Sequence, residues 1–223
     1  MRRALALLLL AVPLSACGGT SAVKTLDPLA QATGRTTSVA GAHFTLTGSF
    51  VVAGKRVAFG GPGEIADHGR AVHLHLSFPM DGKTTSLEAV GVDGSFYVRG
   101  GPFAQLAGGK WVRVRRDAAG LDLSLQDPSK LLDYLQATTK VTKVGSATVR
   151  GAHTTHYRAL VQRPELRNAP IDVWVGDDGL VRRVAVKAQH VTASLDLFDF
   201  GDVSVTVPPD SEALDLSNML GGG

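Results

Sequence analysis

Apolar and polar residues alternate along most of this chain, and the alternation limits the fold more than any other feature. A period of two is typical of strands that bury one face and leave the other in water. The clearest examples are the strands expected over 42–52 and 72–78. Their apolar faces carry Phe44, Leu46, Phe50, Leu74, Leu76 and Phe78.

Short turn signals separate the expected strands and predict antiparallel neighbours. Asp93-Gly94 lies between strands expected over 86–92 and 95–99, and Asp177-Asp178-Gly179 precedes another over 180–188. Aspartate followed by glycine supplies the positive φ angles of a tight hairpin. Pro208-Pro209 should end the sheet, since proline cannot donate to a ladder. Further strands are expected over 55–59, 111–115, 147–149, 153–161, 171–175, 191–200 and 203–207.

Aspartate–proline pairs predict where two helices begin. Asp27-Pro28 and Asp127-Pro128 each place a capping carboxylate before a proline, which suits the first helical position. The expected helices cover 26–39 and 128–138, and the second presents Leu131, Leu132 and Leu135 on one face. A long sheet with one apolar face needs a cover, which these helices would provide. The predicted fold class is therefore α+β: a large antiparallel sheet covered by a few helices, without a βαβ rhythm.

The N-terminus has the pattern of a bacterial export signal. Arg2-Arg3 precede an apolar run over 4–13, whereas a membrane span needs about 20 apolar residues. The following stretch, Leu14-Ser15-Ala16-Cys17, resembles the lipobox of bacterial lipoproteins. In such proteins the cysteine is lipidated and becomes the first residue after cleavage. An ordinary secretory signal with a cysteine at its cleavage site is the alternative.

These features divide the chain into four parts. We expect a removed signal peptide over 1–16, a lipidated cysteine and tether over 17–25, one domain over 26–215 and a flexible tail over 216–223. No apolar run after Cys17 reaches spanning length. The protein is then expected at the extracytoplasmic face of the cell membrane, held by the lipid on Cys17.

The charge of the expected mature chain is nearly balanced. Removal of Arg2 and Arg3 leaves 21 of the 23 basic residues against 20 acidic ones. No basic stripe is present, so nucleic acid is not an expected partner. Arg113 and Arg115 alternate with valines and suit a solvated strand face, with anionic head groups as an alternative contact. Cys17 is the single cysteine, so no disulfide can form within the chain.

Histidines provide the nearest approach to a metal or catalytic site. His73 and His75 share a strand face, and His153 and His156 lie three residues apart. No carboxylate joins either pair at an obvious ligand spacing, so solvated strand faces are the preferred interpretation. A nucleophile elbow and a phosphate-cradling loop are both absent from the sequence. We therefore expect no metal, no cofactor and no catalytic residues, and hence a protein that is not an enzyme.

Several stretches, taken in order with the lipobox, resemble a known family. The actinobacterial lipoproteins typified by LppX and LprG, which share a half-barrel with the LolA and LolB lipoprotein carriers, show similar motifs. The resemblance runs from about Lys24 to Asp215. It rests on residues 43–50, 127–132, 144–151 leading to His156-Tyr157, and 172–183, with Phe200-Gly201 before 205–209.

This resemblance implies an antiparallel half-barrel closed by helices around an apolar cavity. Family members resemble carriers of acylated lipids, whose chains lose about 0.8 kcal/mol for each CH₂ left in water. The implied partners are a diacyl or triacyl (glyco)lipid, the cytoplasmic membrane and an envelope export protein, and the chain is expected to be a monomer. The expected cavity wall consists of Phe44, Leu46, Phe50, Leu74, Leu76, Phe78, Leu131, Leu132 and Leu135.

Two alternatives stay open at this point. Alternation fits a filled core as well as a cavity, because both need apolar residues that face inward. A filled core would suit a lipoprotein that acts as an envelope adaptor or sensor through protein contacts. The loop over 100–109 holds Phe103 and Leu106 between glycine pairs, and forms either a mobile lip at the cavity entrance or an ordinary connection with one buried anchor.

Overall fold

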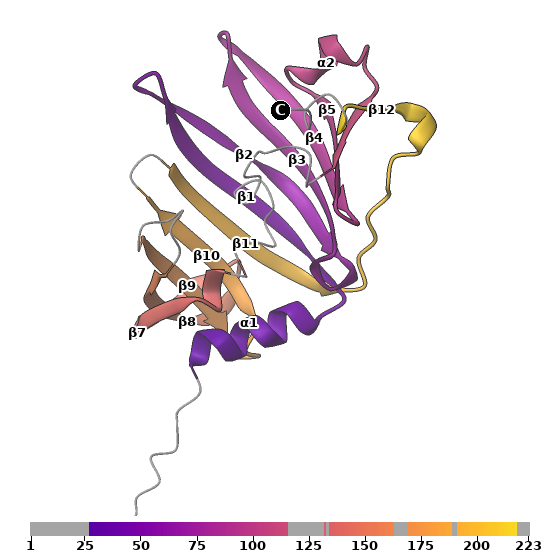
Figure 1. Cartoon of the computed structure of the whole chain (residues 1–223). Helices are drawn as coiled ribbons and strands as arrows, with labels where there is room; N and C mark the ends of the chain where they lie inside the picture. Colours follow the sequence, from indigo (N-terminus) through magenta and orange to yellow (C-terminus); the bar gives the residue numbers. More distant parts are fainter. Residues whose placement is uncertain (1–26, 116–131, 133, 163–168, 189–190, 218–223) are drawn as a thin grey trace, which may run out of the picture.

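The structure of the chain is a computed structural model, which describes residues 27–115, 132, 134–162, 169–188 and 191–217. These residues form a curved 12-stranded sheet (Figure 1). Helix α1 is Pro28–Ser38, α2 is Phe103–Leu106, and short 3-10 turns cover Asp67–Gly69 (η1) and Asp210–Glu212 (η4). The strands are β1 (Gly41–Val52), β2 (Lys55–Ala66), β3 (Ala71–Met80), β4 (Lys83–Val92), β5 (Ser95–Gly100), β6 (Trp111–Arg115), β7 (Thr138–Val149), β8 (Ala152–Val161), β9 (Pro170–Gly176), β10 (Val181–Lys187), β11 (Val191–Gly201) and β12 (Ala213–Asp215).

The sheet consists of two meanders that meet in its middle. Strands β1 to β6 follow one another outward to one edge, and β7 to β11 begin at the opposite edge and return inward. The seam is the antiparallel pair of β1 and β11, where Phe44 lies opposite Leu197 and Leu46 opposite Leu195. The short strand β12 then pairs in parallel with β6. This arrangement confirms the predicted fold class, a large antiparallel sheet with few helices.

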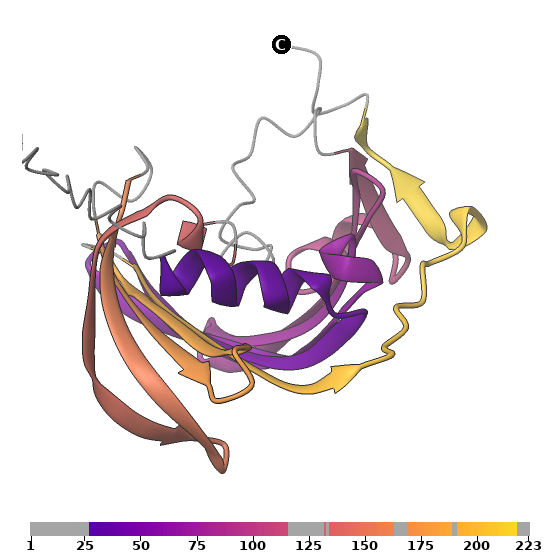
Figure 2. The ribbon, with the colours of Figure 1, turned by 90° about the horizontal axis from the view of Figure 1, so that it is seen from below.

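Helix α1 lies on the concave side of the sheet and crosses one end of it (Figure 2). The side chain of Asp27 accepts a hydrogen bond of 2.9 Å from the backbone N–H of Leu29, which confirms the predicted cap before Pro28. Leu29 is fully buried in the main core. The buried hydroxyl oxygen of Thr36 accepts a hydrogen bond of 2.9 Å from the backbone N–H of Val181, which fixes the helix to β10.

Phenylalanine rings cover glycines of the neighbouring strand on the concave face. Phe44 lies directly opposite Gly63, and Gly48 opposite Phe59. A Cβ atom on Gly63 would lie 2.3 Å from the Phe44 ring, and one on Gly48 would lie 2.5 Å from the Phe59 ring. Because glycine has no side chain, each ring can lie against the adjacent strand, and the strands can bend toward this side.

The residues that follow β11 form a C-terminal strap, defined here as residues 202–212. The strap crosses the convex face of the sheet before β12 begins (Figure 2). Val205, from the strap, and Ala213 pack against a small core of Val90, Tyr97 and Trp111. The strand expected over 203–207 is therefore wrong. Its alternation comes from packing one side of an extended segment onto the sheet, not from strand pairing.

Ion pairs and a buried end hold the strap at the β6 edge. Arg113 lies 2.9 Å from the carboxylate of Asp210 and 2.6 Å from that of Asp215. Leu216 and Ser217, which the sequence assigned to the flexible tail, are only 8% and 5% exposed. The ordered domain thus reaches beyond residue 215, because Leu216 joins an apolar cluster with α2 and β6.

The remaining differences are two unexpected elements and several shifted ends. Helix α2 lies within the expected loop, and β12 continues the sheet after Pro208-Pro209, which were expected to end it. Strand β2 continues to Ala66 and β7 begins at Thr138, whereas the sequence indicated only 55–59 and 147–149. The glycines and Pro62 in β2 and the polar first half of β7 hide the alternation. In the helix expected over 128–138 the described residues are helical up to Leu135, and β7 begins at the expected last residue of that helix, Thr138. No helix among the described residues is long and apolar enough to cross a membrane.

Replacing Gly63 with alanine should destabilise the protein, because the new Cβ would lie 2.4 Å from the His73 carbonyl oxygen as well as against the Phe44 ring. Overpacking of this kind costs about 1–3 kcal/mol. Urea unfolding of the full chain measures the loss. The control is Gly145→Ala in β7, where nothing lies within 4 Å of the new Cβ, and which should change stability by less than about 0.5 kcal/mol. Equal effects of the two substitutions would contradict this account of the curvature.

Attachment of β12, which directly follows the strap, should weaken in acid through Asp215. Hydrogen bonds from the Ser217 side chain and backbone, aided by Arg113, lower the pKa of Asp215 from 3.8 to about 2. A lowered pKa stabilises the folded state above the ordinary pKa, and this contribution disappears as the pH falls toward 2. In a Trp174→Phe background, we expect the Trp111 fluorescence to change over this acidic range. Asp215→Asn should remove that change, whereas Asp81→Asn in the β3–β4 turn should preserve it.

Candidate functional site

Much of the cavity wall expected from the sequence lies in the packed core. Phe44, Leu46 and Leu74 are at most 3% exposed, and Leu135 is fully buried. Leu132 joins them in the main core beneath α1. At this end of the concave face the side chains fill the space against one another, as the filled-core alternative predicts.

The opposite end of the concave face is more open. Phe50, Leu76 and Phe78, also expected to line the cavity, are only partly buried. The register places Val57 opposite Phe50 and Leu87 opposite Leu76, and both are partly buried too. The ring of Phe59 lies 5.8 Å from that of Phe50 and belongs to the same group. We call this group the open-end strip; it consists of Phe50, Val57, Phe59, Leu76, Phe78 and Leu87.

The other candidate residues have separate positions. Phe103 in α2 packs on a small cluster that includes Val112 and Leu216, whereas Leu106 is 59% exposed. The loop thus has one anchored and one free apolar side chain, and its role as a lip stays a prediction. Cys17 and Leu131 lie outside the described residues.

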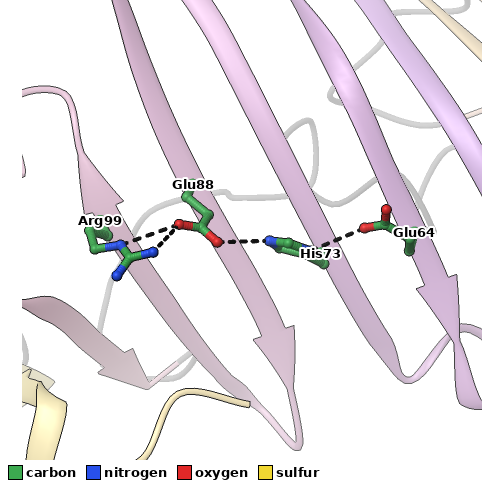
Figure 3. A network of polar contacts seen from close by, with 4 residues as sticks. All are labelled: Glu64, His73, Glu88 and Arg99. Carbon is green, nitrogen blue, oxygen red and sulfur yellow. Dashed lines mark hydrogen bonds and ion pairs between the residues drawn. The ribbon is translucent and has the colours of Figure 1, made fainter. Parts of the chain in front are cut away.

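The convex face carries a row of polar side chains that crosses neighbouring strands. We call this set the polar row, and its members come from β1 to β5. The register places Glu64 opposite both His43 and His73, and Glu88 opposite Arg99. Acidic and basic groups alternate along it (Figure 3). The polar row consists of His43, Glu64, His73, Glu88 and Arg99.

His73 lies between two carboxylates. Its Nδ1 is 3.1 Å from Oε2 of Glu64, and its Nε2 is 3.0 Å from Oε1 of Glu88. The contact between His73 Nδ1 and Glu64 Oε2 is close but is not aligned as a hydrogen bond. The buried Oε2 atom of Glu64 therefore accepts no hydrogen bond. The other oxygen of Glu88 accepts from the Arg99 guanidinium, whose charge also lies 4.5 Å from the centre of the Trp111 ring. Burial raises the pKa of Glu88, but hydrogen bonds from Arg99 and His73 lower it overall.

A cavity of about 630 Å³ lies between the polar row and the strap. Its floor includes His73 and Glu88. Strap residues, among them Asp202, Ser204 and Glu212, form the opposite wall. The cavity is lined by both charged and apolar groups, so it suits small polar or ionic ligands better than an acyl chain.

The grouping around His73 is the feature that the sequence did not reveal. Glu88 is 15 residues from His73 along the chain, and the β3–β4 hairpin register brings it opposite His75. The atoms of His73, His75 and Glu88 that could bind a metal all lie within 4.8 Å of one another. Counting residues along both strands from the Asp81-Gly82 turn would have placed Glu88 opposite His75. The spacing rules applied to single strands could not.

His153, His156 and Arg113, which the sequence also singled out, have structural partners. His153 contacts Asp177 at 3.1 Å, whereas His156 contacts Asp172 at 2.7 Å and stacks on Trp174. These two histidines therefore pair with different carboxylates and do not form one site. Arg113 ties the strap to β6 through Asp210, and β12 to β6 through Asp215.

Comparison with known proteins supports the fold. No family model matches the chain. SCO4650 of Streptomyces coelicolor, described provisionally as a lipoprotein, is 28% identical over 155 residues, which are 61% of this chain and 54% of that protein. The chain thus matches about half the length of this relative.

Two crystal structures resemble the chain over most of its length. LprF from Mycobacterium bovis has a TM-score of 0.50 at 14% identity, and the match covers 82% of this chain and 94% of LprF. The lipoprotein LppX from Mycobacterium tuberculosis has a TM-score of 0.54 at 12% identity, with coverage of 82% and 100%. The chain therefore has the fold of LprF and of the lipoprotein LppX, which confirms the half-barrel implied by the family resemblance.

Proposed function

We propose that this protein is a lipid-anchored envelope lipoprotein that binds an acylated lipid on the concave face of its sheet. The open-end strip contacts an acyl chain, and the packed core beneath α1 limits how far that chain penetrates. A diacyl or triacyl (glyco)lipid is the proposed ligand. The protein would carry this lipid as a monomer from the extracytoplasmic face of the membrane to an export partner.

The open-end strip is the observation that carries the proposal. Its apolar side chains lie on the concave face and are only partly buried. They belong to the parts of β1 to β4 nearer the β1–β2 and β3–β4 turns, and α1 lies at the other end of the sheet (Figure 1). Removing apolar groups from water gains about 0.8 kcal/mol for each CH₂. An acyl chain laid along the strip would gain that energy and would also cover the exposed rings. The opposite, convex face of the same strands carries the polar row.

The anchor is proposed from the N-terminal sequence. The export signal and lipobox end at Cys17, the single cysteine of the chain. The lipoprotein name of LppX and the description of SCO4650 agree with such an anchor. Stable anchoring needs more than one acyl chain, and a lipoprotein cysteine can carry several.

A second candidate function follows from the filled part of the concave face. Phe44, Leu46 and Leu74 are too deeply buried to contact a ligand in this structure. A lipoprotein with a filled core would act as an adaptor or sensor through protein contacts. The experiment below separates the two functions, because an adaptor does not need a bound lipid.

Replacing Leu76 with arginine should abolish lipid binding, because a charged group would lie in the proposed path of the acyl chain. Full-length protein is extracted in detergent, incubated with envelope lipids from an actinobacterium and measured by native mass spectrometry. The mass of the denatured chain gives the covalent anchor, so the difference between the two masses is bound lipid. We expect at least about a tenfold loss of bound lipid.

The matched control is Ser77→Arg, which adds the same charge at the next residue on the exposed, convex side of β3. This variant should keep the lipid occupancy of the unmodified protein, and circular dichroism should show both variants folded. Lipid bound equally by the Leu76 and Ser77 variants would overturn the proposed binding surface. A protein that takes up no lipid from the extract would support the adaptor function instead.

Replacing Cys17 with alanine should abolish the lipid anchor, because no other thiol is available for acylation. Cells grown with labelled palmitate should incorporate label into the unmodified protein and none into the variant. Ser15→Ala leaves the thiol in place and should preserve labelling. Equal labelling of the Cys17 variant would show that the N-terminus is not a lipoprotein signal.

A further inference from the structure

The convex face carries three side chains that could bind a metal, His73, His75 and Glu88, and the proposed lipid-binding surface does not include them. His73 and His75 point from the same side of β3, with ring centres 4.5 Å apart. Glu88 lies directly opposite His75 on β4. Their donor atoms lie within 4.8 Å of one another. Two imidazoles and one carboxylate are a common ligand set for zinc sites that keep an open position.

The contacts of His73 suit a metal ligand. Its Nε2 lies 3.0 Å from Oε1 of Glu88, and two ligand atoms on one tetrahedral zinc are about 3.3 Å apart at ordinary bond lengths. Its Nδ1 faces Oε2 of Glu64 at 3.1 Å. A carboxylate at the second ring nitrogen is the usual way in which a metal-bound histidine is oriented. A small rotation of His73 would give the buried Glu64 oxygen the hydrogen bond that it lacks.

The remaining ligands are also prepared for a cation. Arg99 donates to Oε2 of Glu88, which leaves Oε1 directed toward the histidines. Among the described residues His75 makes no hydrogen bond or ion pair, and its exposed ring gives a metal ion access from water.

We propose that His73, His75 and Glu88 bind one divalent transition-metal ion, with zinc as the representative ion, and that Glu64 orients His73 from behind. Three protein ligands leave at least one coordination position for water or a small anion. The adjacent cavity beneath the strap gives such a ligand room beside His73 and Glu88. This site is independent of the concave face, so it does not rest on the proposed lipid function.

Zinc titration of the purified full-length protein tests the proposal. The protein carries no histidine tag, is treated with EDTA and is dialysed before calorimetry with zinc chloride. Bound metal is then counted by plasma mass spectrometry. We expect one zinc ion per chain, and cobalt in its place should show the visible absorption of a tetrahedral site. His75→Ala and Glu88→Gln should each weaken binding at least about tenfold, and Glu64→Gln should weaken it less.

The control is His153→Ala, which removes an exposed histidine beside a different carboxylate, Asp177, and should leave the affinity unchanged. Thermal unfolding followed by circular dichroism verifies that each variant is folded; His75 is exposed, so its loss should be tolerated. Absence of stoichiometric zinc in the unmodified protein would overturn the proposal. So would zinc binding that His75→Ala and Glu88→Gln leave intact, or that His153→Ala reduces equally.

Discussion

The contact of phenylalanine rings with glycines on the next strand is the constraint on which this structure depends. At Phe44 and Gly63, and again at Phe59 and Gly48, the ring occupies the space that a Cβ would take. A sheet with bulky groups at every inward position could not bend as far, because its side chains would collide on the concave side. The curvature then decides the rest: one short helix can cross one end of the concave face, and the other end stays more open.

The two faces of the same strands perform different tasks. On the concave face the apolar residues of both meanders meet at the β1–β11 seam and make a common core. On the convex face charged residues pair across strands, as in the polar row and in the contact of Arg183 with Asp196 beyond the seam. Cross-strand partners of opposite charge stabilise a sheet by a few tenths of a kcal/mol each. The strap adds a second layer over part of this face and encloses the cavity above His73.

Local patterns were sufficient for most elements, because their causes lie within a few residues. The Asp27 cap, the Asp93-Gly94 turn and the alternation in β1 and β3 each act over one turn or one strand. Prediction failed where the signal came from distant contacts. Residues 203–207 alternate like a strand, but Val205 packs on Trp111 and its neighbours without strand pairing. The lysines and threonines of the edge strand β7 conceal the length of that strand.

The sequence by itself determined that the chain forms a large antiparallel sheet with one apolar face, because strand period, turn residues and caps are local properties. It also placed Phe50, Leu76 and Phe78 on that face. Only the tertiary structure decided which inward residues are packed and which stay accessible, since this depends on where α1 lies. It alone brought Glu64 and Glu88 to the two nitrogens of His73, because the pairing of separate strands sets which side chains become neighbours.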